Sequence, residues 1–112
     1  MKTTYQIDIS SVMVDNYLFA AVNKVYKILP LKEHGEETLG KYIHSLVREM
    51  LGCHEMIEVF QNDSRYLDVV GALHYMSGHI EEMELEDVKS DVFRCINLIK
   101  NLRRQYKCEV SP

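Results

Sequence analysis

The chain has 112 residues, of which 46% are apolar and 27% are charged, and its net charge is −4 at pH 7. This length predicts one domain with one core, and the composition excludes a disordered chain. The longest apolar run has five residues, Leu18 to Val22, far fewer than the roughly 18 that a membrane span requires. The N-terminus shows no apolar stretch of signal-peptide length. We therefore expect a cytoplasmic protein with no membrane partner.

The spacing of the apolar residues is helical throughout and predicts four helices. Pro30 is expected to end the first, because proline donates no backbone hydrogen bond and disfavours helix at the preceding residue. Thr38 is the expected N-cap of the second. Loops this short make neighbouring helices antiparallel, so the prediction is an all-α, up-down-up-down four-helix bundle. The predicted helices span residues 11–29, 38–62, 64–83 and 88–107, within an N-terminal arm (1–10), a bundle domain (11–108) and a C-terminal tail (109–112).

Each predicted helix carries one apolar stripe with steps of three and four residues, which we expect to face the core. The two glycines Gly71 and Gly78 lie seven positions apart and suggest a close backbone approach between helices, unless the spacing is chance. The predicted core residues are Val14, Leu18, Ala21, Val22, Val25, Leu29, Leu39, Ile43, Leu46, Val47, Met50, Ile57, Phe60, Tyr66, Val69, Val70, Leu73, Met76, Ile80, Met83, Val88, Val92, Cys95, Ile99, Leu102 and Tyr106.

Apolar side chains also occur outside these stripes, more of them than a monomeric bundle needs. Large exposed apolar patches are uncommon on monomers, so the surplus favours a homo-oligomer. Scattered surface apolar residues are the alternative. The candidate oligomer-interface residues are Val12, Phe19, Tyr26, Tyr42, Met56 and Val59.

The sequence offers little for catalysis or metal binding. Three cysteines without a Cys-x-x-Cys pair predict core residues and one exposed thiol, not a disulfide framework or a zinc site. No histidine follows a glutamate by three positions, as a di-iron bundle site requires. We therefore expect no catalytic residues, no metal and no cofactor. His54 is expected to be a packed histidine with one hydrogen-bond partner.

Charge is unevenly distributed along the chain. Residues 36–84 carry 3 basic and 10 acidic residues, a net charge of −7, whereas residues 85–112 carry 6 basic and 4 acidic residues, a net charge of +2. The basic residues near the C-terminus follow i, i+3, i+4, i+7 spacing and form one stripe. The stripe is either a solvated helix end or an anion-binding patch repeated around an oligomer. Its members are Lys100, Arg103, Arg104 and Lys107.

One stretch resembles a known family. Residues 25–30 read Val-Tyr-Lys-Ile-Leu-Pro, followed by Lys32, by His34-Gly35 and by Thr38-Leu39-Gly40. This resembles the accessory variability determinant (Avd) proteins of diversity-generating retroelements, which are related to the four-helix proteins encoded in rRNA intervening sequences. More loosely, the resemblance covers residues 20–105.

The Avd resemblance implies a four-helix protomer in a homopentameric barrel, without catalysis. It implies binding to the retroelement's reverse transcriptase and template RNA. The corresponding basic residues are Lys24, Lys27, Lys32, Lys41, Lys100, Arg103, Arg104 and Lys107.

The leading hypothesis is therefore a non-catalytic accessory protein that binds a reverse transcriptase and its RNA or cDNA. One alternative is a protein-interaction adaptor of the same fold that binds no nucleic acid. A second is a helical ribonuclease, because Arg48 and His54 resemble the Arg-x4–6-His signature of the HEPN group.

Overall fold

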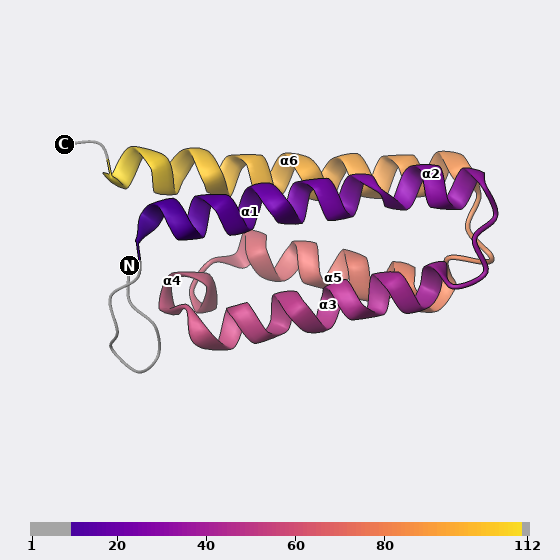
Figure 1. Cartoon of the computed structure of the whole chain (residues 1–112), viewed down its shortest axis with the longest axis horizontal. Helices are drawn as coiled ribbons and strands as arrows, with labels where there is room; N and C mark the ends of the chain where they lie inside the picture. The colour runs from indigo at the N-terminus through magenta and orange to yellow at the C-terminus, as the bar shows by residue number, and fades with distance from the viewer. Residues whose placement is uncertain (1–9, 111–112) are drawn as a thin grey trace.

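The structure, a computed structural model, describes residues 10–110, with side chains up to residue 105, and every regular element in this part of the chain is an α-helix (Figure 1). The predicted all-α class is thus confirmed. The predicted arm (residues 1–9 of it), the core residue Tyr106 and the basic residue Lys107 lie outside the described residues or side chains. The helices are α1 (Ser11–Tyr26), α2 (Ile28–Glu33), α3 (Leu39–Met56), α4 (Glu58–Gln61), α5 (Ser64–His79) and α6 (Leu85–Val110).

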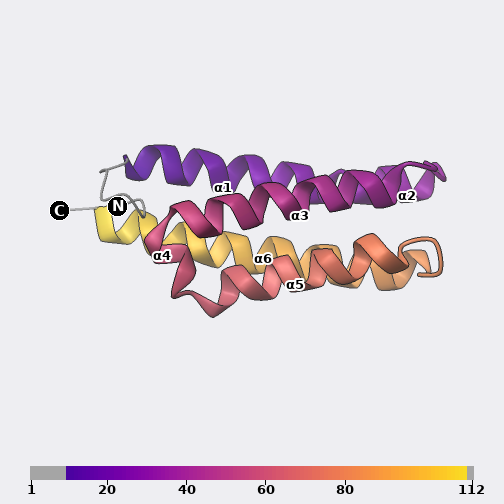
Figure 2. The ribbon, with the colours of Figure 1, turned by 90° about the horizontal axis from the view of Figure 1, so that it is seen from below.

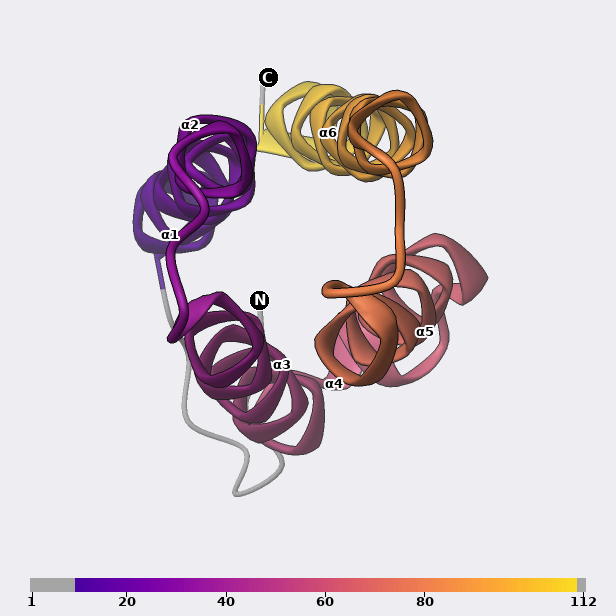
Figure 3. The ribbon, with the colours of Figure 1, turned by 90° about the vertical axis from the view of Figure 1, so that its right-hand side faces the viewer.

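The long helices lie lengthwise in a body of 45 × 25 × 19 Å. Helices α1 and α5 run in one direction and α3 and α6 in the other, with α2 extending α1 (Figures 1 and 2). Seen end-on, they surround a common centre (Figure 3). Helix α6 packs against α1 and α5, and α3 packs against α5. None of the described helices is long and apolar enough to cross a membrane.

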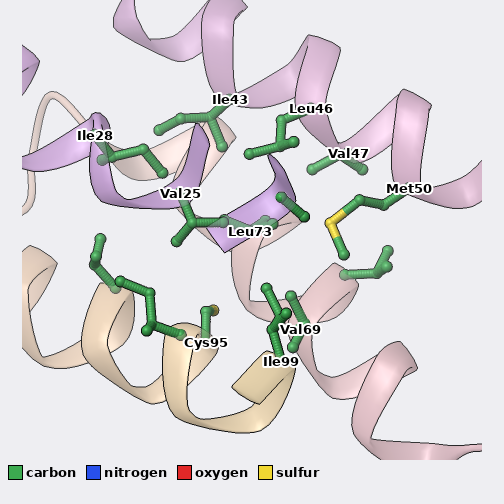
Figure 4. Packing of buried hydrophobic residues seen from close by; sticks show 14 of the residues in the cluster. Val25, Ile28, Ile43, Leu46, Val47, Met50, Val69, Leu73, Cys95 and Ile99 are labelled. Carbon is green, nitrogen blue, oxygen red and sulfur yellow. The ribbon is translucent and has the colours of Figure 1, made fainter. Parts of the chain in front are cut away.

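The apolar stripes of these helices meet in one core (Figure 4). Every predicted core residue with a described side chain is buried, except Val22 and Met83, which are half-buried at its edge. Burial of such side chains is worth about 1.5–3 kcal/mol each and is the main stabilising term. Ile28 and Ile96 are also buried in this core, although the stripes did not predict them.

The predicted end of the first helix at Pro30 is wrong. Helix α1 ends at Tyr26, and α2 passes through Pro30 to Glu33. Pro30 has no N–H to donate to the Tyr26 carbonyl, so the helix is interrupted at Lys27. Yet Pro30 lies in the first turn of α2, where no donor is needed. Ile28, the first residue of α2, is completely buried in the core.

A turn at His34-Gly35 follows α2. Gly35 adopts φ 68°, a left-handed conformation that favours glycine. Its N–H donates to the Lys32 carbonyl at 3.1 Å, and the Glu36 N–H donates to the Leu31 carbonyl at 3.0 Å. These two bonds are those of a Schellman motif, and they end α2.

The predicted continuous second helix is also wrong. Helix α3 ends at Met56, Ile57 is extended (φ −114°, ψ 112°), and α4 adds one short turn. On an unbroken helix Phe60 would point about 80° away from the core stripe. With the break, Phe60 is completely buried and stacks on Tyr66, with ring centroids 4.3 Å apart.

Two expected local features are replaced by others. The Thr38 side chain does not cap α3; its hydroxyl donates to Glu36 Oε1 at 2.9 Å. A Cβ added at Gly71 or Gly78 would meet nothing within 4 Å, so the predicted close approach there is wrong. The tight contact is at Gly40, where a Cβ would lie 3.2 Å from the Ser77 carbonyl oxygen of α5.

Candidate nucleic-acid interface

The structure brings exposed aromatic rings and basic side chains together on one surface between α1 and α6. Phe19 and Tyr26 project from α1 and are 51% and 54% exposed; Phe93 projects from α6 and is 47% exposed. Phe19 and Tyr26 were predicted as oligomer contacts, yet they adjoin predicted anion-binding residues. We call this surface the α1–α6 face; it comprises Phe19, Asn23, Tyr26, Phe93, Asn97, Lys100, Arg103 and Arg104.

Helical periodicity explains this arrangement. Phe19 and Tyr26 are seven residues apart on α1, and Phe93 and Lys100 are seven apart on α6. A spacing of seven keeps side chains on one side of a helix. Because α1 and α6 pack side by side, the two rows meet along their seam.

Two hollows lie along this seam. The first has a volume of about 350 Å³ and a floor that includes Val22 and Ile96; it is also lined by Asn23, Tyr26, Phe93, Asn97 and Lys100. The second has a volume of about 250 Å³ and is lined by Asp15, Lys100, Arg103 and Arg104. Because Lys100 lines both, the aromatic hollow and the basic hollow adjoin.

Arg103 is fixed in place at this face. Its Nε donates to Asp15 Oδ1 at 2.9 Å and a terminal nitrogen donates to Asp15 Oδ2 at 3.2 Å. Its guanidinium also lies over the Phe19 ring, 4.9 Å from the centroid, a favourable cation–π geometry. Asp15 offsets much of the Arg103 charge. Lys100 and Arg104 are exposed and form no ion pair with any residue that the structure describes, so their charges remain available.

Of the other predicted basic residues, Lys24, Lys32 and Lys41 do not join this patch. Lys24 pairs with Glu49 at 2.8 Å, and Lys32 Nζ donates to the Ile80 carbonyl at 2.7 Å. Lys27 is exposed between α1 and α2. Lys41 lies on α3 in a groove of about 780 Å³ that also contains three glutamates, Glu37, Glu81 and Glu82.

The remaining candidate oligomer residues divide into two groups. Val12 and Met56 are 64% and 53% exposed. Tyr42 and Val59 are half-buried and pack against the core of their own chain. The Tyr42 hydroxyl donates to the Lys24 carbonyl at 2.7 Å, and burial raises the pKa of Tyr42. These two residues thus already contribute to the protomer.

A second cluster, of aromatic residues, is buried where α3 meets α4. The Tyr66 hydroxyl donates to the Met50 carbonyl at 2.6 Å, and the His54 ring stacks on Tyr66 with centroids 6.0 Å apart. His54 Nε2 is buried without a hydrogen-bond partner among the described residues, so the single partner expected for it is not found at this atom.

The structure does not join Arg48 to His54, because the Arg48 side chain is exposed and the His54 Nε2 is buried. Within the described part of the chain, no group of three His, Cys, Asp or Glu side chains is placed to hold a metal ion. Cys95 is buried and Cys53 is half-buried, both as free thiols.

Three residues of the α1–α6 face were not predicted, namely Asn23, Phe93 and Asn97. The available signal was the phase of Phe93, which lies one heptad before Lys100 on the basic stripe. No protein-family model, no curated protein and no solved structure matches this chain. The geometry of the α1–α6 face therefore carries the functional argument.

Proposed function

We propose that this chain is a non-catalytic accessory protein of a diversity-generating retroelement. It binds the reverse transcriptase and its RNA or cDNA in the cytoplasm through an oligomeric four-helix bundle. The observation that carries the proposal is the α1–α6 face, where exposed aromatic rings stand beside Lys100 and Arg104, which are exposed and form no ion pair with a described residue. Proteins that bind nucleic-acid strands combine cationic side chains with aromatic side chains in this way.

Charge placement supports this proposal despite the net charge of −4. Acidic residues gather where α2 meets α3 and where α5 meets α6, near Glu36, Glu37, Glu81 and Glu82. The basic residues of the face, Lys100, Arg103 and Arg104, belong to the C-terminal half of α6, which lies toward the opposite end of the molecule (Figure 1). At physiological ionic strength charges are screened over about 8 Å, so a polyanion at the basic end is little affected by the acidic end.

Assembly into a homo-oligomer, proposed to be a pentamer, lets this small patch bind nucleic acid strongly. One chain offers only three described cations at the face, one of them paired with Asp15. Repeating the face around a ring gives multivalent binding and a steeper dependence on salt. Val12 and Met56, both largely exposed, supply apolar surface for subunit contacts. Light scattering should give a mass of about 66 kDa for five 13.1 kDa chains.

Salt-dependent RNA binding tests the nucleic-acid part of the proposal. Affinity for a single-stranded RNA should fall steeply between 50 and 200 mM salt, because phosphate contacts release counterions. The double variant Lys100→Glu/Arg104→Glu should bind at least tenfold more weakly and with a shallower salt slope. Lys41→Glu/Arg48→Glu changes the net charge equally on α3, where both side chains are exposed, and should bind almost as tightly as the natural chain.

A pull-down with the reverse transcriptase encoded beside this gene tests the partner. The proposal expects capture that weakens in the Lys100→Glu/Arg104→Glu variant. Salt-insensitive capture together with no RNA binding would instead establish the protein-interaction adaptor. The absence of a reverse transcriptase gene nearby would overturn the retroelement assignment.

A further inference from the structure

We propose that the α1–α6 face binds the unpaired bases of a single strand, which stack on Tyr26 and Phe93 while the backbone lies along Lys100 and Arg104. This inference rests on the proposed function and adds which form of nucleic acid is bound. The ligand of the face is single-stranded RNA or cDNA, and the face distinguishes one base sequence from another only weakly.

The aromatic rings that line the hollow of this face have no ring partner among the described residues. Elsewhere, Tyr17 contacts Phe60, Phe60 stacks on Tyr66, and Tyr75 stacks on His79 at 4.1 Å. Tyr26 and Phe93 are half-exposed and contact no other ring in the described part of the protein. They come from neighbouring helices and line the same hollow. Open rings of this kind are stacking platforms for bases.

The hollow that Tyr26 and Phe93 line also has polar side chains in its wall. Asn23 and Asn97 line the hollow. Neither side-chain amide forms a hydrogen bond within the residues that the structure describes. An amide both donates and accepts, so it can meet the exposed edge of any unpaired base. In a duplex the Watson–Crick edges are paired and the ring faces are stacked, so neither is available to this face.

The two hollows lie next to each other along the seam between α1 and α6. The aromatic hollow of about 350 Å³ adjoins the basic hollow of about 250 Å³, and Lys100 lines both. A base in the first would leave its backbone next to Lys100 and Arg104. The Phe19 ring with the Arg103 guanidinium above it extends the row of flat groups along the seam. Charge and shape thus favour an anionic chain with planar side groups over an apolar protein surface.

The test uses the full chain and three RNA probes of equal length: a single strand of uridines, the same backbone with abasic sites, and a duplex. The natural chain should bind the uridine strand about 10- to 100-fold more tightly than the abasic strand. Tyr26→Leu/Phe93→Leu keeps apolar side chains but removes both stacking surfaces, so it should bind both strands at the abasic level. Its affinity for the duplex should not change.

The matched control is Tyr75→Leu, which removes an equally exposed ring from α5 and should leave all three affinities unchanged. Equal binding of the uridine and abasic strands would overturn the stacking inference while leaving the proposed function intact. Loss of oligomer mass in the Tyr26→Leu/Phe93→Leu variant would also overturn it, because the face would then hold a second copy of the chain. If no probe binds at any salt concentration, the proposed function itself fails.

Discussion

Tyr17 of α1 and Tyr66 of α5 face each other across the core, with their hydroxyl oxygens 3.1 Å apart. Tyr66 is completely buried, and its hydroxyl also donates to the Met50 carbonyl. Through this contact the tyrosines link α1, α3 and α5 at the end where α3 gives way to α4. Burial raises the pKa of both tyrosines above the usual 10.0, because an ionised phenolate is poorly solvated there.

The raised pKa values of Tyr17 and Tyr66 predict a loss of stability at alkaline pH. Above pH 10 the unfolded chain releases the tyrosine protons while the folded chain retains them. The stabilising contribution is therefore complete below pH 10 and falls as the pH rises toward the folded-state pKa. Each tyrosine lowers the free energy of unfolding by about 1.4 kcal/mol per pH unit in this range. Urea unfolding between pH 8 and 11 measures the fall.

Substitutions isolate the contribution of these tyrosines from those of the other ionisable groups. With Tyr17→Phe, the free energy of unfolding should fall less steeply above pH 10, by up to about 1.4 kcal/mol per pH unit. Leu67→Ala, at an exposed side chain without an ionisable group, should leave the slope as it is. An identical decline in both variants would show that Tyr17 does not keep its proton in the folded protein.

Gly40 and Gly71 should respond oppositely to alanine. At Gly40 the new Cβ would lie 3.2 Å from the Ser77 carbonyl oxygen, and this backbone atom is held within α5. At Gly71 the Cβ would meet nothing within 4 Å, so only helix propensity changes. We expect Gly71→Ala to raise the free energy of unfolding by about 1 kcal/mol, and Gly40→Ala to lower it by a similar amount. Denaturant unfolding of both variants decides; equal gains would contradict the tight contact.

Cys95 should resist thiol reagents in the folded protein. It is completely buried, and burial raises its pKa to about 12. The thiolate is the reactive species, so at pH 8 only about one Cys95 in ten thousand is ionised. Cys53 is half-buried and should react faster. Peptide mapping after labelling separates the sites, and urea should make their rates equal. Modification of native Cys95 at the Cys53 rate would contradict its place in the core.

The sequence was sufficient to predict the core but not the interruptions of the helices. Apolar periodicity identifies core residues such as Leu18 and Leu73 because each helix buries one stripe. The break at Lys27 has a local cause, the missing N–H of Pro30, but the helix resumes and passes through the proline. The break at Ile57 depends on tertiary contacts. It allows Phe60 to stack on Tyr66, a contact between segments whose relative positions the stripes do not define.

For the candidate interface, the sequence predicted the components but not their combination. The spacing of Lys100, Arg103 and Arg104 predicted a basic stripe, and Phe19 and Tyr26 were predicted separately as oligomer contacts. Only the packing of α1 against α6 shows that the two groups share one surface. Pairings such as that of Lys24 with Glu49 connect residues 25 positions apart, so charge counting along the chain could not remove Lys24 from the basic patch.

His54 should destabilise the folded protein, because its Nε2 is buried without a hydrogen-bond partner in the described part of the chain. An unpaired buried polar atom costs about 1–3 kcal/mol. His54→Leu retains apolar packing against Tyr66 and should raise the free energy of unfolding by about 1 kcal/mol. Arg48→Leu, at an exposed position on the same helix, should change it by less than about 0.5 kcal/mol.

The same two variants address the ribonuclease alternative. If His54 is only a packed residue, both variants bind RNA as the natural chain does, cleavage is absent or unchanged, and the stability gain appears in His54→Leu alone. A helical ribonuclease of the Arg-x4–6-His type would lose cleavage in each variant. Cleavage by the natural chain that disappears in both would contradict the packing role and replace the accessory function with an enzymatic one.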